Sequence, residues 1–146
     1  AAMVEKLKRV ADTAARGGIV LGIEPTSEHF LPSMLVFHAA DALAIVEAVA
    51  HPAVRMVFDT GHLRAMDGEL LPQLERCRHA IGTIQVADHP GRTDLGTGTI
   101  DWVPLLRRVR EIGYAGLVEL EHLPRDPGAD GERALLERLA TIDALC

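Results

Sequence analysis

Four oxygen-bearing side chains lie at or near the ends of four separate apolar segments of the sequence. Glu24, Asp59 and Glu121 each close such a segment, and Gln85 interrupts the remaining one. Three carboxylates at one point would repel one another and raise one another's pKa unless a cation lay between them. All-oxygen ligands suit Mg²⁺ or Mn²⁺ better than Zn²⁺, which usually prefers His or Cys. If the fold brings these residues together, they predict one divalent-cation site.

Each of these residues also has a simpler interpretation. An acid that follows a parallel strand is often an ordinary helix N-cap or loop residue, and this holds for Glu24, Asp59 and Glu121 taken singly. Gln85 differs because it interrupts an apolar stretch, residues 81–87. A buried amide there needs polar partners, which favours a role in a site.

The elements that must position these side chains follow from the spacing of apolar residues. The pattern predicts alternating helices and strands, and the predicted strands are continuous apolar runs, as in parallel strands covered by helices. We therefore predict an α/β fold in a single domain, residues 1–146. The predicted helices span 3–16, 39–49, 70–79, 101–112 (with Asp101 as N-cap) and 132–145, and the predicted strands span 19–23, 54–58, 81–86 and 117–120.

Four helix–strand units are compatible with two architectures. One is half of a (β/α)8 TIM barrel, and the other is a doubly wound sheet with helices on both faces. In a barrel the C-terminal ends of the strands converge on one site. The location of the four polar residues at strand ends favours the half barrel.

Longer segments resemble a known group of proteins. IEP (23–25), FDTGHLRAMDGEL (58–70), IGTIQVADHPGRTDLGTGTIDW (81–102) and GYAGLVELEHLP (113–124) resemble the sugar phosphate isomerase/epimerase and AP endonuclease 2 superfamily, which has xylose-isomerase-like TIM barrels. Within it, the chain is most similar to hydroxypyruvate isomerases. The resemblance runs over nearly the whole chain and implies strands five to eight of the family barrel, without the N-terminal half.

The resemblance also implies roles for individual residues. It makes Glu24, Asp59, Gln85 and Glu121 the metal ligands, and Glu24 and Glu121 also the acid/base carboxylates. Glu119 points to the same side of its strand as Glu121, so only the alignment selects Glu121. His62 and Arg92 correspond to substrate-binding positions. From the residues alone, His62 could instead be a structural histidine at a helix start and Arg92 a solvated loop arginine.

The implied activity is a metal-dependent isomerisation of a small hydroxy-carbonyl acid or sugar, of the hydroxypyruvate/tartronate-semialdehyde type. A carboxylate would shuttle a proton through an enediolate stabilised by Mg²⁺ or Mn²⁺. Gln85, where many relatives carry His, favours this branch over the ketose 3-epimerases. A ketose 3-epimerase, a non-catalytic half-barrel binding module and a metal-dependent abasic-site endonuclease remain as alternatives.

Composition and charge limit the classes of partner that we expect for this chain. The net charge of −6 and the pI near 5.6 argue against nucleic-acid binding, which needs clustered Lys and Arg. No apolar run has membrane-spanning length, and Cys77 and Cys146 lack the spacing of a disulfide framework or thiolate zinc site, so we expect a cytoplasmic protein. A half barrel would expose two sheet edges and an apolar inner face. We therefore expect self-association or pairing with a missing N-terminal half.

Overall fold

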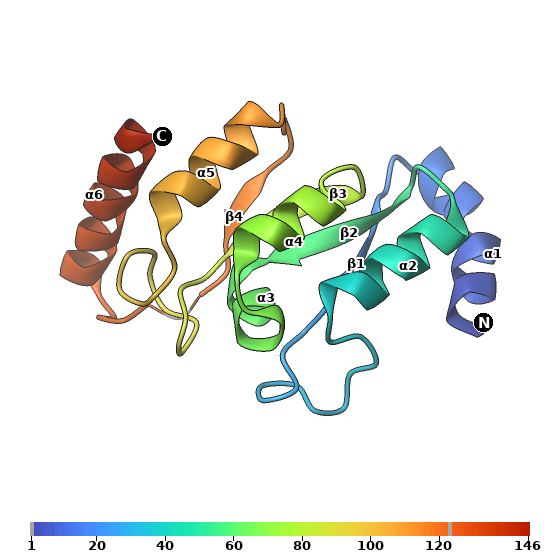
Figure 1. Cartoon of the computed structure of the whole chain (residues 1–146), viewed down its shortest axis with the longest axis horizontal. Coiled ribbons are helices and arrows are strands. Elements are labelled where there is room, and N and C mark those ends of the chain that lie inside the picture. The colour runs from blue at the N-terminus through green and yellow to red at the C-terminus, as the bar shows by residue number, and fades with distance from the viewer. Residues whose placement is uncertain (1, 123) are drawn as a thin grey trace.

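A computed structural model describes residues 2–122 and 124–146. Its sheet has four parallel strands in the order β1-β2-β3-β4. Helices cover one face of this sheet (Figure 1). The elements are α1 (Ala2–Arg16), β1 (Leu21–Ile23), α2 (Ala39–Val49), β2 (Val54–Asp59), α3 (Thr60–Asp67), α4 (Leu70–Cys77), β3 (Ile81–Val86), α5 (Trp102–Glu111), β4 (Val118–Leu120) and α6 (Ala129–Leu145).

The arrangement is half of a (β/α)8 barrel. The strands follow one another across the sheet in chain order, and α1, α2, α4, α5 and α6 lie side by side in the same order (Figure 1). A doubly wound sheet would reverse its strand order at one point and carry helices on both faces. The structure therefore excludes that alternative and confirms the predicted α/β half barrel.

The core lies between the sheet and this helical layer. Alternate residues of β2, namely Val54, Met56 and Phe58, are buried against the helices together with Ile84 and Val86 of β3. Because side chains alternate across a strand, the residues between them face the inside of the barrel. The outward residues of the two central strands, β2 and β3, thus supply hydrophobic burial, and the inward residues are left for the site.

The inner face is only partly apolar. Its positions carry Val57 together with small or polar residues, among them Gly22, Arg55 and Gly82, which lie side by side. Arg55 donates hydrogen bonds to the carbonyl oxygens of His79 and Ile81. A Cβ at Gly22 would come within 2.7 Å of a Val57 methyl, and one at Gly82 within 2.5 Å of the Arg55 Cβ. The missing side chains therefore leave room for Val57 and Arg55.

Two local features differ from the sequence prediction. The segment Thr60–Asp67, which was not predicted as a helix, forms α3, and Asp59 caps it by accepting a 2.8 Å hydrogen bond from the backbone N–H of His62. Asp101 occupies the N-cap position of α5 as predicted, but its side chain makes no capping hydrogen bond. A carboxylate at a strand end thus starts a helix where apolar spacing is weak.

Asp88 organises the long connection between β3 and α5. Its buried carboxylate accepts hydrogen bonds from the backbone N–H groups of His89, Gly96 and Ile100 and from the indole N–H of Trp102. Burial acts to raise the pKa of Asp88, but these hydrogen bonds outweigh it, so the pKa lies below its ordinary value. The segment that carries Arg92 is therefore held in place at both ends.

Both edges of the sheet carry exposed apolar side chains. Val118 and Leu120 of β4 remain 46% exposed although they point toward the helical side. They line an open groove of about 470 Å³ between β4, α5 and α6. Ile19 and Val20 are exposed beside the opposite edge, that of β1. Within the described residues, no helix is long and apolar enough to cross a membrane.

Candidate metal centre

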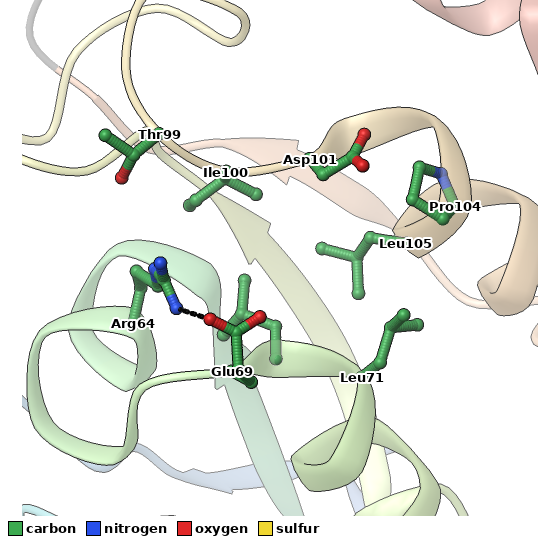
Figure 2. Close-up of a pocket in the computed structure, with 9 residues that line it drawn as sticks. Arg64, Glu69, Leu71, Thr99, Ile100, Asp101, Pro104 and Leu105 are labelled. Carbon is green, nitrogen blue, oxygen red and sulfur yellow. Dashed lines mark hydrogen bonds and ion pairs between the residues drawn. The ribbon is translucent and has the colours of Figure 1, made fainter.

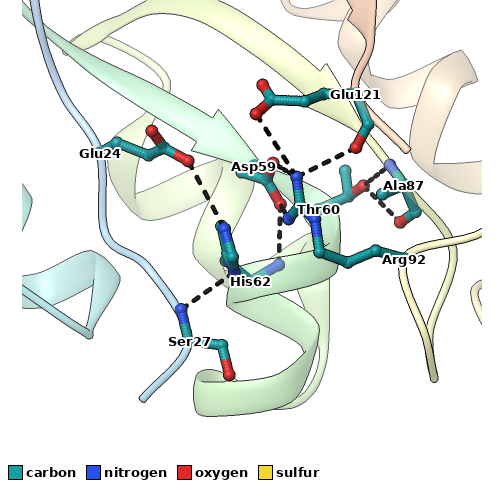
Figure 3. A network of polar contacts seen from close by, with 8 residues as sticks. All are labelled: Glu24, Ser27, Asp59, Thr60, His62, Ala87, Arg92 and Glu121. Carbon is teal, nitrogen blue, oxygen red and sulfur yellow. Dashed lines mark hydrogen bonds and ion pairs between the residues drawn. The ribbon is translucent and has the colours of Figure 1, made fainter. Parts of the chain in front are cut away.

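The topology brings the four predicted ligands to one edge of the sheet. Asp59 is the last residue of β2 and pairs in register with Gln85 of β3. Glu24 directly follows β1, and Glu121 directly follows β4. Because all four strands are parallel, these residues lie at the same end of the half barrel. Figure 3 shows Glu24, Asp59 and Glu121 at this end.

Glu24 and Asp59 form the centre of the cluster with His62. One oxygen or nitrogen of each of the three side chains lies within 4.8 Å of the others, and Asp59 is fully buried. The pKa of Glu24 is raised to about 7, chiefly by burial and then by the nearby carboxylates of Asp59 and Glu121, while Arg92 opposes the shift. The carboxylates are therefore close enough to disfavour one another's charge, as the sequence predicted for a cation site.

His62 is oriented as a hydrogen-bond donor. Its Nδ1 accepts a 3.0 Å hydrogen bond from the backbone N–H of Ser27, and its Nε2 lies 3.6 Å from Glu24 Oε1 (Figure 3). Burial lowers the pKa of His62, Asp59 opposes this shift and Arg92 adds to it. The ring is then neutral with its proton on Nε2, because Nδ1 must keep a lone pair for Ser27. A metal bond at Nε2 would require the ring to lose this last proton, so His62 is better suited to hold an oxygen of a ligand.

Arg92 lies between Asp59 and Glu121 (Figure 3). Its NH1 and NH2 groups donate to Oδ1 and Oδ2 of Asp59 at 2.8 and 3.0 Å. NH2 also donates to the backbone carbonyl of Glu121 at 3.0 Å and lies 3.7 Å from that residue's Oε1. The sequence predicted Arg92 near the substrate, and here its guanidinium contacts two predicted metal ligands.

A cavity of about 270 Å³ opens beside this cluster and is lined by Phe30, Gly91, Arg92, Glu121 and His122. Sequence reasoning did not find Phe30. Its ring meets the edge of the His62 ring at a centroid distance of 6.1 Å, so the loop after β1 adds an apolar wall. A single aromatic residue in a loop carries no periodic signal, and only the fold places it here.

Another pocket lies away from the strand ends. It occupies about 260 Å³ between the start of α4 and the segment leading into α5, and an Arg64–Glu69 ion pair lies at its side (Figure 2). None of the predicted site residues lines it. The chemistry-bearing residues are therefore gathered at the strand ends and not at this pocket.

Comparison with known proteins gives the evolutionary context of this arrangement. The sequence profile of the xylose isomerase-like TIM barrel family matches residues 1–142. The chain belongs to this family. Its curated relatives include hydroxypyruvate isomerase from Escherichia coli, 29% identical over 133 residues, which are 91% of this chain and 52% of that protein. A putative hydroxypyruvate isomerase from Streptomyces coelicolor is 35% identical over 128 residues, 84% of this chain and 46% of that protein.

Two further relatives extend the range of activities in the family. A 2-oxo-tetronate isomerase from Cupriavidus necator is 29% identical over 125 residues, 86% of this chain and 48% of that protein. The crystal structure of an AP endonuclease of family 2 from Brucella melitensis superposes with a TM-score of 0.85 at 28% identity, covering 92% of this chain and 52% of that one. The chain thus spans about half the length of the relatives it matches.

Xylose isomerase-like barrels often use divalent metals, and the residues of this chain fit such an ion. Gln85 Oε1 is buried and has no hydrogen-bond partner among the described residues, although it lies in register with Asp59. A buried carbonyl oxygen without a partner costs free energy, which a cation ligated there would offset. The carboxylates of Glu24 and Asp59 lie within 4.8 Å of one another at the same strand ends, and carboxylate and carbonyl oxygens are donors that hard divalent cations accept.

We expect Glu24→Gln to raise the free energy of unfolding of the cation-free chain by about 1–2 kcal/mol at pH 8, after allowance for solvent screening, and to leave it unchanged near pH 4. The pKa of Glu24 is raised in the folded protein, so its protonated form is the one that the fold favours. The contribution of Glu24 to stability is therefore complete below pH 4.5, and it is lost as the carboxyl ionises and the pH rises through about 7. Urea unfolding across this pH range measures the effect. Glu28→Gln, a change at an exposed residue of the next loop, is the control. An equal response of both variants would contradict the prediction.

Proposed function

We propose that this chain, as strands five to eight of the family barrel, carries the metal-binding half of an isomerase that acts on a small hydroxy-carbonyl acid of the hydroxypyruvate type. The positions of Glu24, Asp59, Gln85 and Glu121 at the same ends of four parallel strands, with atoms of Glu24 and Asp59 within 4.8 Å of one another, support this proposal most strongly. The activities named for the relatives, hydroxypyruvate isomerase and 2-oxo-tetronate isomerase, support the substrate class.

In this proposal Glu24, Asp59, Gln85 and Glu121 hold one Mg²⁺ or Mn²⁺ ion. When bound, the ion supplies positive charge against the anionic intermediate of the isomerisation. Asp59 is the most constrained of the four, because it is buried and also caps α3. It therefore acts as a fixed ligand, and the more accessible Glu24 and Glu121 are left for proton transfer.

Isomerisation moves one hydrogen between neighbouring carbons. A carboxylate takes the proton from the carbon that bears the hydroxyl group and returns it to the former carbonyl carbon, while the hydroxyl proton passes to the former carbonyl oxygen. A group that titrates near neutral pH is suited to both directions, and the raised pKa of Glu24 meets this condition. Neutral His62 can donate its Nε2 proton to a substrate oxygen from beside Glu24.

The alternatives have weaker support. A ketose 3-epimerase would use the same two carboxylates on one carbon, but the resemblance at Gln85 favours the isomerase branch. An abasic-site endonuclease would need several metals with more histidines and a surface for phosphates, whereas the cluster found in the described residues contains one His and the net charge is −6. A binding module without catalysis would retain the cation but not the proton transfer.

We also propose that the edges of β1 and β4 pair with further strands, supplied by a second copy or by an N-terminal half. Exposed apolar side chains at both edges and the half-length match to relatives support this pairing. A cytoplasmic location remains a prediction from the sequence.

Cation binding is the first test of the proposed function. We expect the full chain to bind Mn²⁺ in calorimetry, and Gln85→Leu to weaken this binding about tenfold or more, since it removes one ligand. Thr83→Val is the matched control, because Thr83 is also a polar residue of β3 but lies further from the strand end. Absence of Mn²⁺ binding, or an equal loss in both variants, would contradict the site.

Activity is the second part of the same test. Hydroxypyruvate in deuterated water should exchange with tartronate semialdehyde only in the presence of the cation, and light scattering of the active sample identifies the assembly that carries the activity. Turnover that survives complete chelation would contradict a metal-dependent isomerase.

A further inference from the structure

Arg92 and the backbone N–H of His62 together occupy most of the ligand capacity of Asp59. Oδ1 of Asp59 accepts from Arg92 NH1 and from the backbone N–H of His62, and Oδ2 accepts from Arg92 NH2. A carboxylate offers about four lone-pair sites, so three of those on Asp59 are already used. Any cation that takes Asp59 as a ligand must therefore compete with the guanidinium.

We propose that Arg92 is an exchangeable internal cation: it pairs with Asp59 and Glu121 while no divalent cation is bound, and it releases Asp59 when one binds. The released guanidinium then turns into the neighbouring cavity and binds the carboxylate of the substrate. This inference rests on the proposed function and adds an order of binding, in which the divalent cation precedes the anionic substrate.

The backbone around Arg92 confines this movement to the side chain. Asp88 and Thr93 pair across the turn, with the Asp88 N–H donating to the Thr93 carbonyl at 2.9 Å. Gly91 and Arg92 both adopt positive φ angles, of 94° and 50°. Left-handed backbone at a non-glycine residue persists only where the surrounding structure holds it, which marks this turn as fixed.

The surroundings leave a path for the arginine. The Arg92 side chain runs past Gly61. A Cβ at Gly61 would lie 3.4 Å from both Cγ and NH1 of Arg92. The adjacent cavity, which Arg92 itself lines, is open to solvent between Phe30 and Glu121. Rotation about the side-chain bonds can therefore carry the guanidinium from Asp59 to the cavity without a change in the turn.

The released arginine suits a carboxylate substrate. A guanidinium forms two parallel hydrogen bonds with a carboxylate, and in the observed state it makes this contact with Asp59. When the carboxylate of the substrate replaces that of Asp59, the guanidinium makes the same two parallel hydrogen bonds. Before the cation binds, the negative cluster of Glu24, Asp59 and Glu121 also disfavours an anion, so binding of the two ligands is mutually favourable.

Calorimetric titration of the full chain with Mn²⁺ tests the exchange through three variants. Arg92→Gln should bind Mn²⁺ at least about tenfold more tightly than wild type, which corresponds to about 1.4 kcal/mol. Arg92→Lys should also bind it more tightly, because an ammonium group keeps the charge but cannot engage both Asp59 oxygens in the same way. Arg64→Gln removes an arginine that pairs with Glu69, and it should leave the affinity unchanged.

A second readout uses the wild-type protein, so that it does not depend on the folding of a variant. Nitrogen-15 NMR of the Arg92 guanidinium should show slow rotation about its Nε–Cζ bond without a divalent cation and fast rotation with saturating Mg²⁺. Binding of glycolate, a small hydroxy-acid probe, should be at least about tenfold tighter in the presence of Mg²⁺, a coupling within the usual range for linked sites.

The outcomes separate this inference from the proposed function. If Arg92→Lys binds Mn²⁺ like wild type while Arg92→Gln binds it more tightly, charge alone acts and the exchange is wrong. Equal affinities in all variants, or guanidinium rotation unchanged by Mg²⁺, also overturn the exchange and leave the metal site intact. Failure of every variant and of wild type to bind Mn²⁺ overturns the proposed function itself.

Discussion

Glu121→Gln should slow isomerisation by about 10²- to 10⁴-fold in the assembled protein while cation binding persists, if weakened. An amide oxygen can still ligate a cation, but an amide cannot accept the proton that a carboxylate shuttles. The position supports this role: Glu121 directly follows β4, is accessible, and contacts Arg92 through both its carbonyl and its carboxylate. Deuterium incorporation into the product, measured by NMR together with Mn²⁺ calorimetry, separates proton transfer from ligation.

Glu119→Gln is the matched control for this experiment. Glu119 belongs to the same strand, points to the same side, and pairs in register with Gln85, but it lies two residues before the strand end. We expect it to retain nearly full turnover. If Glu121→Gln keeps more than about a tenth of the wild-type rate, or if the two variants lose activity equally, the assignment of the catalytic carboxylate is wrong.

Asp88→Ala should lower the free energy of unfolding by about 3–5 kcal/mol. The substitution leaves the buried indole N–H of Trp102 and three partly buried backbone N–H groups without their acceptor. Asp101→Ala provides the contrast, because Asp101 makes no capping hydrogen bond, and its loss should change stability by no more than about 0.5 kcal/mol. Urea unfolding at pH 7 compares the two variants.

The pH dependence of the Asp88 effect gives a further check on its cause. Because its pKa is lowered in the folded protein, the stabilisation is present above the ordinary carboxyl range and disappears as the pH falls through the folded value. Asp88→Asn and wild type should therefore approach equal stability in acid. A constant difference between them at all pH values would mean that shape, and not charge, makes Asp88 necessary.

Much of the fold follows from local pattern. The predicted helix 39–49 and strand 81–86 agree with α2 and β3, because apolar periodicity in both reflects burial on one side. Helix α3 was not predicted, since its sequence TGHLRAMD has few apolar residues and its start depends on a carboxylate from the preceding strand. Gln85 could be selected because a polar residue inside an apolar strand is a visible exception.

The sequence by itself determined which residues stand at the strand ends or in the segments that follow them, and hence the chemistry available: carboxylates, one amide, one imidazole and one guanidinium. Only the tertiary structure decided how they meet. Arg92 and Asp59 are 33 residues apart, and their pairing depends on a turn held by Asp88. The proton of His62 is directed to Nε2 by the backbone of Ser27, 35 residues away. Orientation depends on long-range packing and hydrogen bonds, whereas composition and periodicity report only local burial.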